Sequence, residues 1–347
     1  MKALGNVFSE VLSRYSSHVD EKLEDYLTRL CSREFVEVVL YQVKTGGKRI
    51  RPVMTLLFAE ALGQDWRKAL PESCIVELIH EYSLIFDDII DHSTVRRGKP
   101  TLWKEHGTNF AILAGLWYRE AIEEAILESI DPTLVAKLAS ETMRDIIEGE
   151  RLDILLEATG REDPYYRKNR IIDRLDRDNI ENIYLKMIRK KTASLFRLSC
   201  MLGALSARRR VDEYVEAAAT YGENVGIAFQ LIDDLLDIYG EFEKFGKEIG
   251  KDIKEHKLGN AVIVNILRRG DERDVKVVLE VLSKEKVEDS DIRRVIEIAD
   301  KYDSRKAVLD RASKYAERAV AALERFPENE FKRKLIDIAK FVVYREY

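Results

Sequence analysis

Two acidic cassettes of the same form are the residues of this sequence best suited to chemistry. Residues 87–91 read DDIID and residues 233–237 read DDLLD, each after an apolar stretch. On an α-helix the first and last Asp of such a cassette share one face, and the middle Asp lies about 100° around. Crowded carboxylates repel one another unless a cation joins them, and Mg²⁺ prefers such oxygen ligands together with substrate phosphates. Two such helices facing each other predict a cage for a metal-bound diphosphate.

The duplication of the cassette strengthens this interpretation. A single acidic cassette is more often a solvated helix face than a metal site, but both copies here are flanked by apolar residues rather than by further charges. The predicted metal ligands are Asp87, Asp88, Asp91, Asp233, Asp234 and Asp237.

Four groups of basic residues lie where they can seat phosphates. Residues 46–52 read GGKRIRP and place three cations on a glycine turn ahead of a predicted helix. The free N–H groups and partial positive charge of a helix N-terminus favour anions there. The other groups are Arg96–Arg97, residues 186–191 and the lysines of residues 244–257. Each group on its own is more often a solvated face.

Composition predicts an all-α protein with a large core. The 347 residues include only 17 Gly and 6 Pro, with 46% hydrophobic and 35% charged residues. The formal net charge of −5 argues against a nucleic-acid partner. Three widely spaced cysteines fit reduced core thiols rather than disulfides or a zinc site. No apolar run is long enough for a transmembrane segment, and we expect the protein to be cytoplasmic.

Helical periodicity recurs from about residue 5 to the C-terminus, with short polar or Gly/Pro breaks. Pro132 and Pro164 are placed as at helix starts, with Asp131 and Asp163 as plausible caps. Length alone suggests two domains, but phosphate-binding groups spread over the chain must converge on one site. We therefore expect one domain over residues 1–347.

Five motifs, taken in order, resemble the trans-isoprenyl diphosphate synthases, the polyprenyl synthetase family that makes geranyl, farnesyl, geranylgeranyl and longer prenyl diphosphates. The resemblance covers roughly residues 40 to 260. The motifs are GGKRIRP (46–52), HEYSLIFDDIIDHSTVRRGKPT (80–101), KT (191–192), GIAFQLIDDLLD (226–237) and FGKEIGKDIKEHK (245–257).

The resemblance assigns a role to each matching residue. The two cassettes would hold three Mg²⁺ ions on the allylic diphosphate. The positions that seat isopentenyl diphosphate are matched by Lys48, Arg51, His80 and Arg97. The groups on the allylic diphosphate and its cation are matched by Arg96, Lys191, Thr192, Gln230, Lys247 and Lys257.

The resemblance also implies a reaction and a fold. Mg²⁺ and lysines stabilise the departing diphosphate, the allylic cation is attacked by the double bond of isopentenyl diphosphate, and the released diphosphate takes the proton. The catalytic set would be Asp87, Asp88, Arg96, Lys191, Thr192, Gln230 and Lys247. The family fold is an all-α domain of ten or more helices around a central active-site cavity, assembled as a homodimer.

Two positions depart from the family pattern. Leu116 follows Ala-Gly where an Asp is usual, and Glu150 follows Gly149 where a Gln is usual. Two alternatives therefore stay open beside an active synthase. A class I terpene cyclase also uses DDxxD, although its second metal motif is of the Asn/Ser/Glu type. A non-catalytic partner subunit would be expected to have lost acidic ligands, and none is lost here.

Product length is predicted from the residues one turn before the first cassette. Tyr82 and Ser83 should face the growing tail, because the tail runs from the metal cage along this helix. One large and one small residue resemble the archaeal-type pattern. This suggests geranylgeranyl diphosphate as the product, with farnesyl diphosphate as the second candidate.

Overall fold

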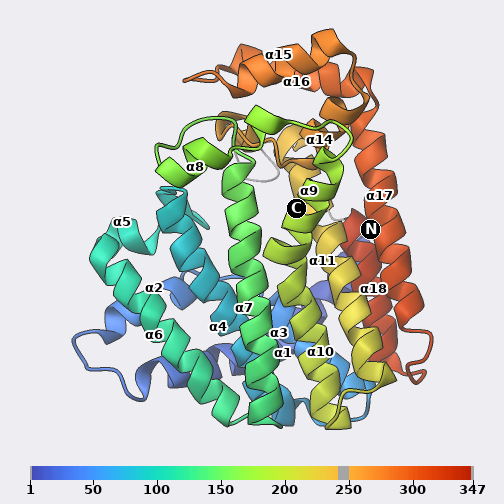
Figure 1. The fold of residues 1–347 in the computed structure, drawn as a ribbon. Coiled ribbons are helices and arrows are strands. Elements are labelled where there is room, and N and C mark those ends of the chain that lie inside the picture. Colours follow the sequence, from blue (N-terminus) through green and yellow to red (C-terminus); the bar gives the residue numbers. More distant parts are fainter. Residues whose placement is uncertain (1, 241–249, 345–347) are drawn as a thin grey trace. The chain divides into compact units, whose positions relative to one another are not determined.

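The computed structural model describes residues 2–240 and 250–344, with the side chains of residues 2–9 left aside, and these residues are predominantly helical (Figure 1). They confirm the predicted all-α class with more than ten helices. In the described part of the chain the one sheet is a two-stranded hairpin. Contacts divide the chain into two compact units, each assembled from three segments. The prediction of one domain with a central cavity stays a prediction.

Unit 1 comprises residues 1–144, 195–222 and 319–338. The elements of its long first segment are α1 (Lys2–Thr28), α2 (Val36–Lys44), α3 (Ile50–Ala61), η1 (Trp66–Ala69), α4 (Leu70–Ile90), β1 (Val95–Arg96), β2 (Lys99–Pro100), α5 (Leu102–His106) and α6 (Thr108–Leu127).

Unit 2 comprises residues 145–194, 223–318 and 339–347. Elements that lie wholly within it are α8 (Pro164–Asn169), η2 (Ile172–Arg174), α9 (Ile180–Ile188), the π-helical turn η3 (Arg189–Ala193), α13 (Lys251–Lys254), α14 (Ala261–Arg269), α15 (Glu272–Leu282) and α16 (Asp289–Lys301). The remaining five helices carry residues of both units and are α7 (Pro132–Leu155), α10 (Ser194–Arg208), α11 (Glu213–Tyr239), α17 (Ser304–Ala322) and α18 (Glu330–Tyr344).

The core of unit 1 forms around α3 and α4. Every residue from Pro52 to Ala59 is buried, and so is every residue from Glu72 to Ile79. Helices that are buried all round belong at the centre of a unit. Helix α4 packs along α6, and the contact is close because a Cβ on Gly115 would meet the Phe86 ring at 2.5 Å.

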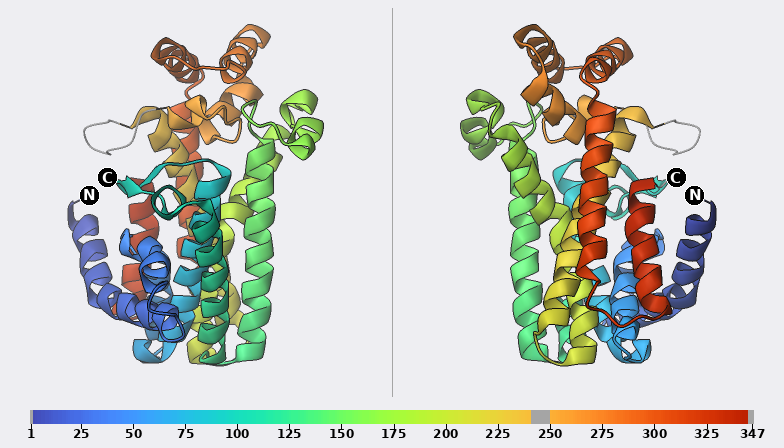
Figure 2. Two further views of the ribbon diagram at one scale, coloured as in Figure 1. Left: turned by 90° about the vertical axis from the view of Figure 1, so that its left-hand side faces the viewer. Right: turned by 90° about the vertical axis from the view of Figure 1, so that its right-hand side faces the viewer.

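Predicted helix boundaries agree with the structure at several points. Helix α7 begins at Pro132, where Asp131 Oδ1 accepts a hydrogen bond from the Leu134 N–H. Helix α8 begins at Pro164, although the Asp163 side chain makes no capping bond. Within unit 2, α15 and α16 lie side by side (Figure 2). Among the described residues no helix is long and apolar enough to span a bilayer.

Candidate active site

The first acidic cassette occupies the C-terminal end of α4. Asp87 and Asp91 are half-buried and bring carboxylate oxygens within 4.8 Å of each other, whereas Asp88 is only 2% exposed. This is the arrangement that the spacing predicts, with the first and last Asp on one face. Asp88 accepts hydrogen bonds from Arg96 Nε at 2.8 and 3.0 Å, and Asp87 accepts one from the same guanidinium at 3.1 Å.

A tight hairpin places Arg96 over the cassette. Arg96 pairs with Lys99, so that Arg97 and Gly98 form a two-residue loop, and both have positive φ, of 54° and 75°. Positive φ at both central residues is the geometry of a type I′ turn. The reversal that brings Arg96 back to α4 occurs earlier, where His92 has a φ of 52° and the Ser93 N–H donates to the Asp88 carbonyl at 3.0 Å.

The glycine turn before α3 is held by a buried charge network. Arg49 has a φ of 51° and its side chain is 4% exposed. It donates hydrogen bonds to Asp20, to Glu77 at 2.8 Å and to Glu81 at 3.0 Å. Buried charges are stable only when they are paired and hydrogen-bonded in this way. The network fixes the backbone that presents Lys48 and Arg51.

Arg97 joins the same network from the hairpin. Its guanidinium donates to Glu81 at 3.1 Å and to the Gly46 carbonyl. A Cβ on Gly47 would lie 3.2 Å from this guanidinium, so the guanidinium packs closely against the glycine turn. The predicted isopentenyl diphosphate residues Lys48, Arg51, His80 and Arg97 all lie in unit 1.

Arg51 and His80 are in direct contact. The Arg51 guanidinium lies 3.2 Å from His80 Nε2 and 4.4 Å from the centre of the Phe196 ring. Arginine can only donate, so Nε2 accepts and the proton of the neutral ring is on Nδ1. Burial, and then the positive charge of Arg51, hold the pKa of His80 well below its usual value. His80 is therefore a neutral acceptor that orients Arg51.

The second cassette, on α11, shows the same pattern of burial as the first. Asp233 and Asp237 are half-buried, whereas Asp234 is 4% exposed. Asp234 accepts hydrogen bonds from Tyr184 Oη at 2.6 Å, Gln230 Nε2 at 2.8 Å and the Ala261 N–H at 2.8 Å. Burial, and then the charge of Asp252, raise the pKa of Asp234 well above its usual value. In both cassettes the middle Asp is anchored by protein donors.

The predicted allylic-site residues of unit 2 form a connected set. The Thr192 hydroxyl donates to Gln230 Oε1 at 2.8 Å, and Gln230 in turn donates to Asp234. Thr192 and Lys191 lie in the π-helical turn η3, and such turns are frequent at functional sites. A Cβ on Gly149 would clash with the backbone of Lys191, so glycine there lets α7 approach η3.

Two lysines share one buried carboxylate in unit 2. Lys191 Nζ lies 2.7 Å from Asp153 Oδ2 and 2.6 Å from Glu150 Oε2, and Lys257 Nζ lies 3.4 Å from Asp153. Burial would raise the pKa of Asp153, but the charges of Lys191 and Lys257 outweigh it and hold this pKa below its usual value. Lys247 lies outside the described residues.

Sequence reasoning missed several residues that organise these clusters. Glu77 and Glu81 lie four residues apart within the apolar α4, and a pair of acids in an apolar helix was the available signal. Nothing in the sequence marked Tyr184 as a partner of Asp234, 50 residues away. Phe86 belongs to the apolar stretch before the first cassette, and its ring lies 5.0 Å from that of Tyr82 and against Gly115.

Comparison with known proteins gives consistent matches. The family model described as Polyprenyl synthetase matches residues 32–299. A geranylgeranyl pyrophosphate synthase of Geoglobus acetivorans is 33% identical over 98% of this chain and 100% of its own length.

Solved structures match over nearly the whole chain as well. The crystal structure of a geranylgeranyl pyrophosphate synthetase from Pyrococcus horikoshii has a TM-score of 0.86 at 30% identity and covers 99% of both chains. A polyprenyl synthase of Caulobacter crescentus, solved with calcium and isoprenyl diphosphate, has a TM-score of 0.83 at 29% identity, over 98% of this chain and 97% of its own.

Proposed function

This chain belongs to the polyprenyl synthetase family and is a trans-prenyltransferase, and we propose that it joins isopentenyl diphosphate head-to-tail to an allylic diphosphate, releasing diphosphate. The observation that carries this proposal is the geometry common to the two cassettes. In each, the first and last Asp are half-buried, and the middle Asp is buried and hydrogen-bonded to protein donors.

The carboxylates present fit Mg²⁺. The oxygens of Asp87 and Asp91 that approach within 4.8 Å are hard ligands of the kind this ion prefers. We propose Asp87 and Asp91 of the first cassette, and Asp233 and Asp237 of the second, as metal ligands; Asp88 and Asp234 are held by Arg96 and Tyr184. Bound Mg²⁺ supplies positive charge that neutralises the departing diphosphate. The number of three ions stays a prediction.

The remaining residues bind and orient the two substrates. Arg51, steadied by neutral His80, presents its guanidinium to the diphosphate of isopentenyl diphosphate with Lys48 and Arg97. Lys191 and Lys257 serve the allylic diphosphate. The oxygen atoms of Thr192 and Gln230, fixed by their mutual hydrogen bond, stabilise positive charge on the allylic carbon. The released diphosphate accepts the final proton.

We propose geranylgeranyl diphosphate as the product, with farnesyl diphosphate as the second candidate. Several relatives carry the name geranylgeranyl diphosphate synthase, which supports the first. Tyr82 is half-buried and packs against Phe86, whereas the Ser83 hydroxyl donates to the His80 carbonyl at 2.7 Å. The bulky Tyr82 is therefore followed by the small Ser83, whose hydroxyl group is already hydrogen-bonded to the backbone.

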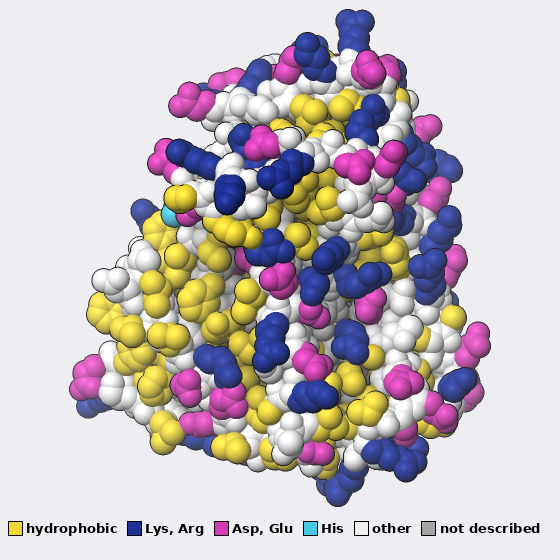
Figure 3. Space-filling view, in the orientation of Figure 1, with side chains coloured by type: hydrophobic (Ala, Val, Ile, Leu, Met, Phe, Trp, Pro, Cys, Tyr) yellow, Lys and Arg dark blue, Asp and Glu magenta, His cyan; other side chains and the backbone are white. Residues whose placement is uncertain are grey.

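A homodimer that forms through α6 is also part of the proposal. Five large apolar side chains on this helix are exposed. Leu127 lies at its C-terminal end, and the other four, exposed by 39% to 53%, lie together in its first half: Phe110, Ile112, Leu113 and Leu116. Figure 3 shows hydrophobic side chains gathered over α6. An apolar patch of this kind marks a protein interface. The predicted cytoplasmic location and the absence of a nucleic-acid partner stay predictions.

One experiment tests the proposed reaction. Purified protein is incubated with Mg²⁺, isopentenyl diphosphate and each allylic primer in turn, and the products are identified by mass. We expect prenyl diphosphates longer than the primer, none of them with EDTA, and turnover lower by about 10³-fold in Asp87→Ala and Asp233→Ala with an unchanged melting temperature. A cyclic hydrocarbon would support the terpene cyclase, and inactivity with every primer would support the non-catalytic subunit.

A further inference from the structure

A basic groove in unit 2 takes no part in the proposed reaction. It has a volume of about 540 Å³ and lies between α14 and α17, with parts of α9 and α11 as its floor. We refer to it as the α14–α17 groove. Its volume is within the range of small-molecule sites, roughly 300–1,000 Å³.

The charge of the groove is opposite to that of the chain. Its lining includes six basic residues and three acidic ones, in a protein of net charge −5. The basic residues are Arg268, Arg269, Lys306, Arg311, Lys314 and Arg318. Figure 3 shows Lys and Arg side chains clustered along α17. A concave surface with an excess of one charge concentrates ligands of the other.

Only part of this positive charge is neutralised by the protein. Glu181 forms ion pairs with Arg268 and Arg311, and Lys306 pairs with Asp310 at 3.1 Å. Within the described residues no carboxylate lies within 4.0 Å of the charged nitrogens of Arg269 or Lys314. Arg269 on α14 and Lys314 on α17 thus bring uncompensated charge to the two walls.

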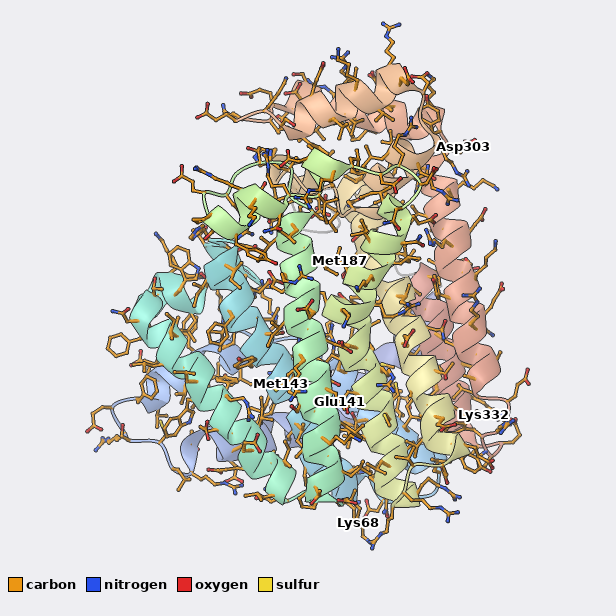
Figure 4. The ribbon with its side chains drawn as sticks, in the orientation of Figure 1. Lys68, Glu141, Met143, Met187, Asp303 and Lys332 are labelled. Carbon is orange, nitrogen blue, oxygen red and sulfur yellow. The ribbon has the colours of Figure 1, made fainter. Side chains whose placement is uncertain are left out.

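We propose that the α14–α17 groove binds a small anion that carries a phosphate or diphosphate group, separately from the two acidic cassettes. Arg269 and Lys314 would contact the anion from opposite helices, and arginine and lysine are the usual phosphate ligands. A flat anionic membrane is a poorer fit, because the lining residues lie in a groove between helices rather than on a level face. Asp303 directly precedes α17 (Figure 4).

The floor of the groove connects it to the second cassette. Tyr184 lines the groove, and its hydroxyl donates to Asp234 at 2.6 Å. An anion that shifts Tyr184 therefore changes the donor set that anchors Asp234. This link rests on the proposed function, whereas the binding itself does not. Equilibrium coupling of this kind is reciprocal.

The test measures binding at the groove alone and needs no turnover. Tyr315 lines the groove beside Arg318, so 19F NMR of protein that contains 3-fluorotyrosine reports binding there, with its signal assigned by Tyr315→Phe. Inorganic diphosphate is titrated in the presence of EDTA, which removes metal-dependent binding at the cassettes. We expect a saturable shift of the Tyr315 signal, accompanied by a shift of Tyr184.

Matched variants make the outcome decisive. Arg269→Ala/Lys314→Ala should weaken the diphosphate affinity by at least about tenfold. A hydrogen bond between charged groups contributes about 1.5 kcal/mol or more, which corresponds to a tenfold change in affinity. Arg293→Ala/Arg294→Ala removes two exposed charges from α16, outside the groove, and should leave the affinity unchanged. An absent Tyr315 shift, or equal affinity in both variants, overturns the proposal.

Two further outcomes are informative. A Tyr315 shift without a Tyr184 shift overturns the link to Asp234. Co-sedimentation with vesicles of anionic phospholipid that is lost in Arg269→Ala/Lys314→Ala, without saturable diphosphate binding, overturns the small-ligand proposal in favour of a membrane surface. Because no measurement involves prenyl transfer, a failure here is distinguishable from a failure of the proposed function.

Discussion

The Arg49 guanidinium lies 3.0 Å from the Glu81 carboxylate, and the two side chains are 4% and 1% exposed. Glu81 also accepts hydrogen bonds from Gln42 at 2.9 Å and from Arg97 at 3.1 Å. A single buried carboxylate thus joins α2, the glycine turn, α4 and the hairpin. The residues predicted to seat isopentenyl diphosphate depend on this shared anchor.

We expect Glu81→Gln to lower the free energy of unfolding by about 2 kcal/mol, because it removes one of the three carboxylates that pair with the buried Arg49 and the carboxylate that pairs with Arg97. The apparent KM for isopentenyl diphosphate should rise as well. Glu123→Gln, which removes one partner of an exposed pair with Arg119, should cost less than about 1 kcal/mol. Urea denaturation measures both, and equal effects would show that the buried network contributes little.

Stability should depend on pH through His80. Its pKa in the folded protein is lowered by burial and then by Arg51, so the unfolded state binds the proton more readily. The contribution of neutral His80 to the free energy of unfolding is complete above about pH 6.5, the pKa of histidine in the unfolded chain. As the pH falls below that value, the free energy of unfolding decreases by at most about 1.4 kcal/mol per pH unit. His80→Gln should flatten this slope, whereas His92→Gln, at an exposed position, should keep it. Melting curves between pH 5 and pH 8 give the comparison.

Glu150→Gln should tighten binding of the allylic diphosphate. Glu150 holds Lys191 at 2.6 Å and so competes with the substrate for this ammonium group. Removal of the charge should lower the apparent KM for the allylic substrate by severalfold, since one ion pair of about 1 kcal/mol is involved. Glu148→Gln is the control, because Glu148 pairs with Arg151 instead. A KM that rises in Glu150→Gln would mean that Glu150 positions Lys191 for the substrate.

Leu116→Asp should convert the proposed dimer to a monomer. Leu116 stands where an Asp is usual in the family, and it is 53% exposed on the apolar face of α6. A charge in the centre of an apolar interface opposes association, and it has little effect on the folded subunit. Sedimentation analysis measures the oligomeric state of Leu116→Asp. Leu30→Asp, which changes another exposed apolar residue, is the control. A dimer that persists in Leu116→Asp would place the interface elsewhere.

Tyr82→Ala should lengthen the product by at least one five-carbon unit. The Tyr82 ring packs on Phe86 at 5.0 Å, so its removal opens space one turn before the first cassette. The fold should be retained, because Tyr82 is only half-buried. Product analysis by mass is the measurement, with Tyr41→Ala, a half-buried tyrosine on α2, as the matched control. An unchanged product distribution in Tyr82→Ala would place the end of the tunnel elsewhere.

Local patterns in the sequence were enough to predict the helical class, several helix boundaries and the face of the helix that Asp87 and Asp91 share. The DDxxD spacing places Asp87 and Asp91 on one face because an α-helix turns every 3.6 residues, and the structure agrees. The order of the motifs pointed to the family, which the family model confirms over residues 32–299. These features depend on residues close together in the chain.

Tertiary structure decided which carboxylates of the two cassettes are buried and which are half-buried. Asp88 and Asp91 are the same residue type three positions apart, yet Asp88 is buried and holds Arg96 at 2.8 Å whereas Asp91 is half-buried, and this difference follows from how the chain folds back after α4. Asp234 is fixed by Tyr184, 50 residues away, and no local pattern encodes a partner at such a separation. The exposure of Leu116 likewise follows from which face of α6 packs on α4. Periodicity tells which face of a helix is apolar, but only the packing of the other helices determines whether that face is covered.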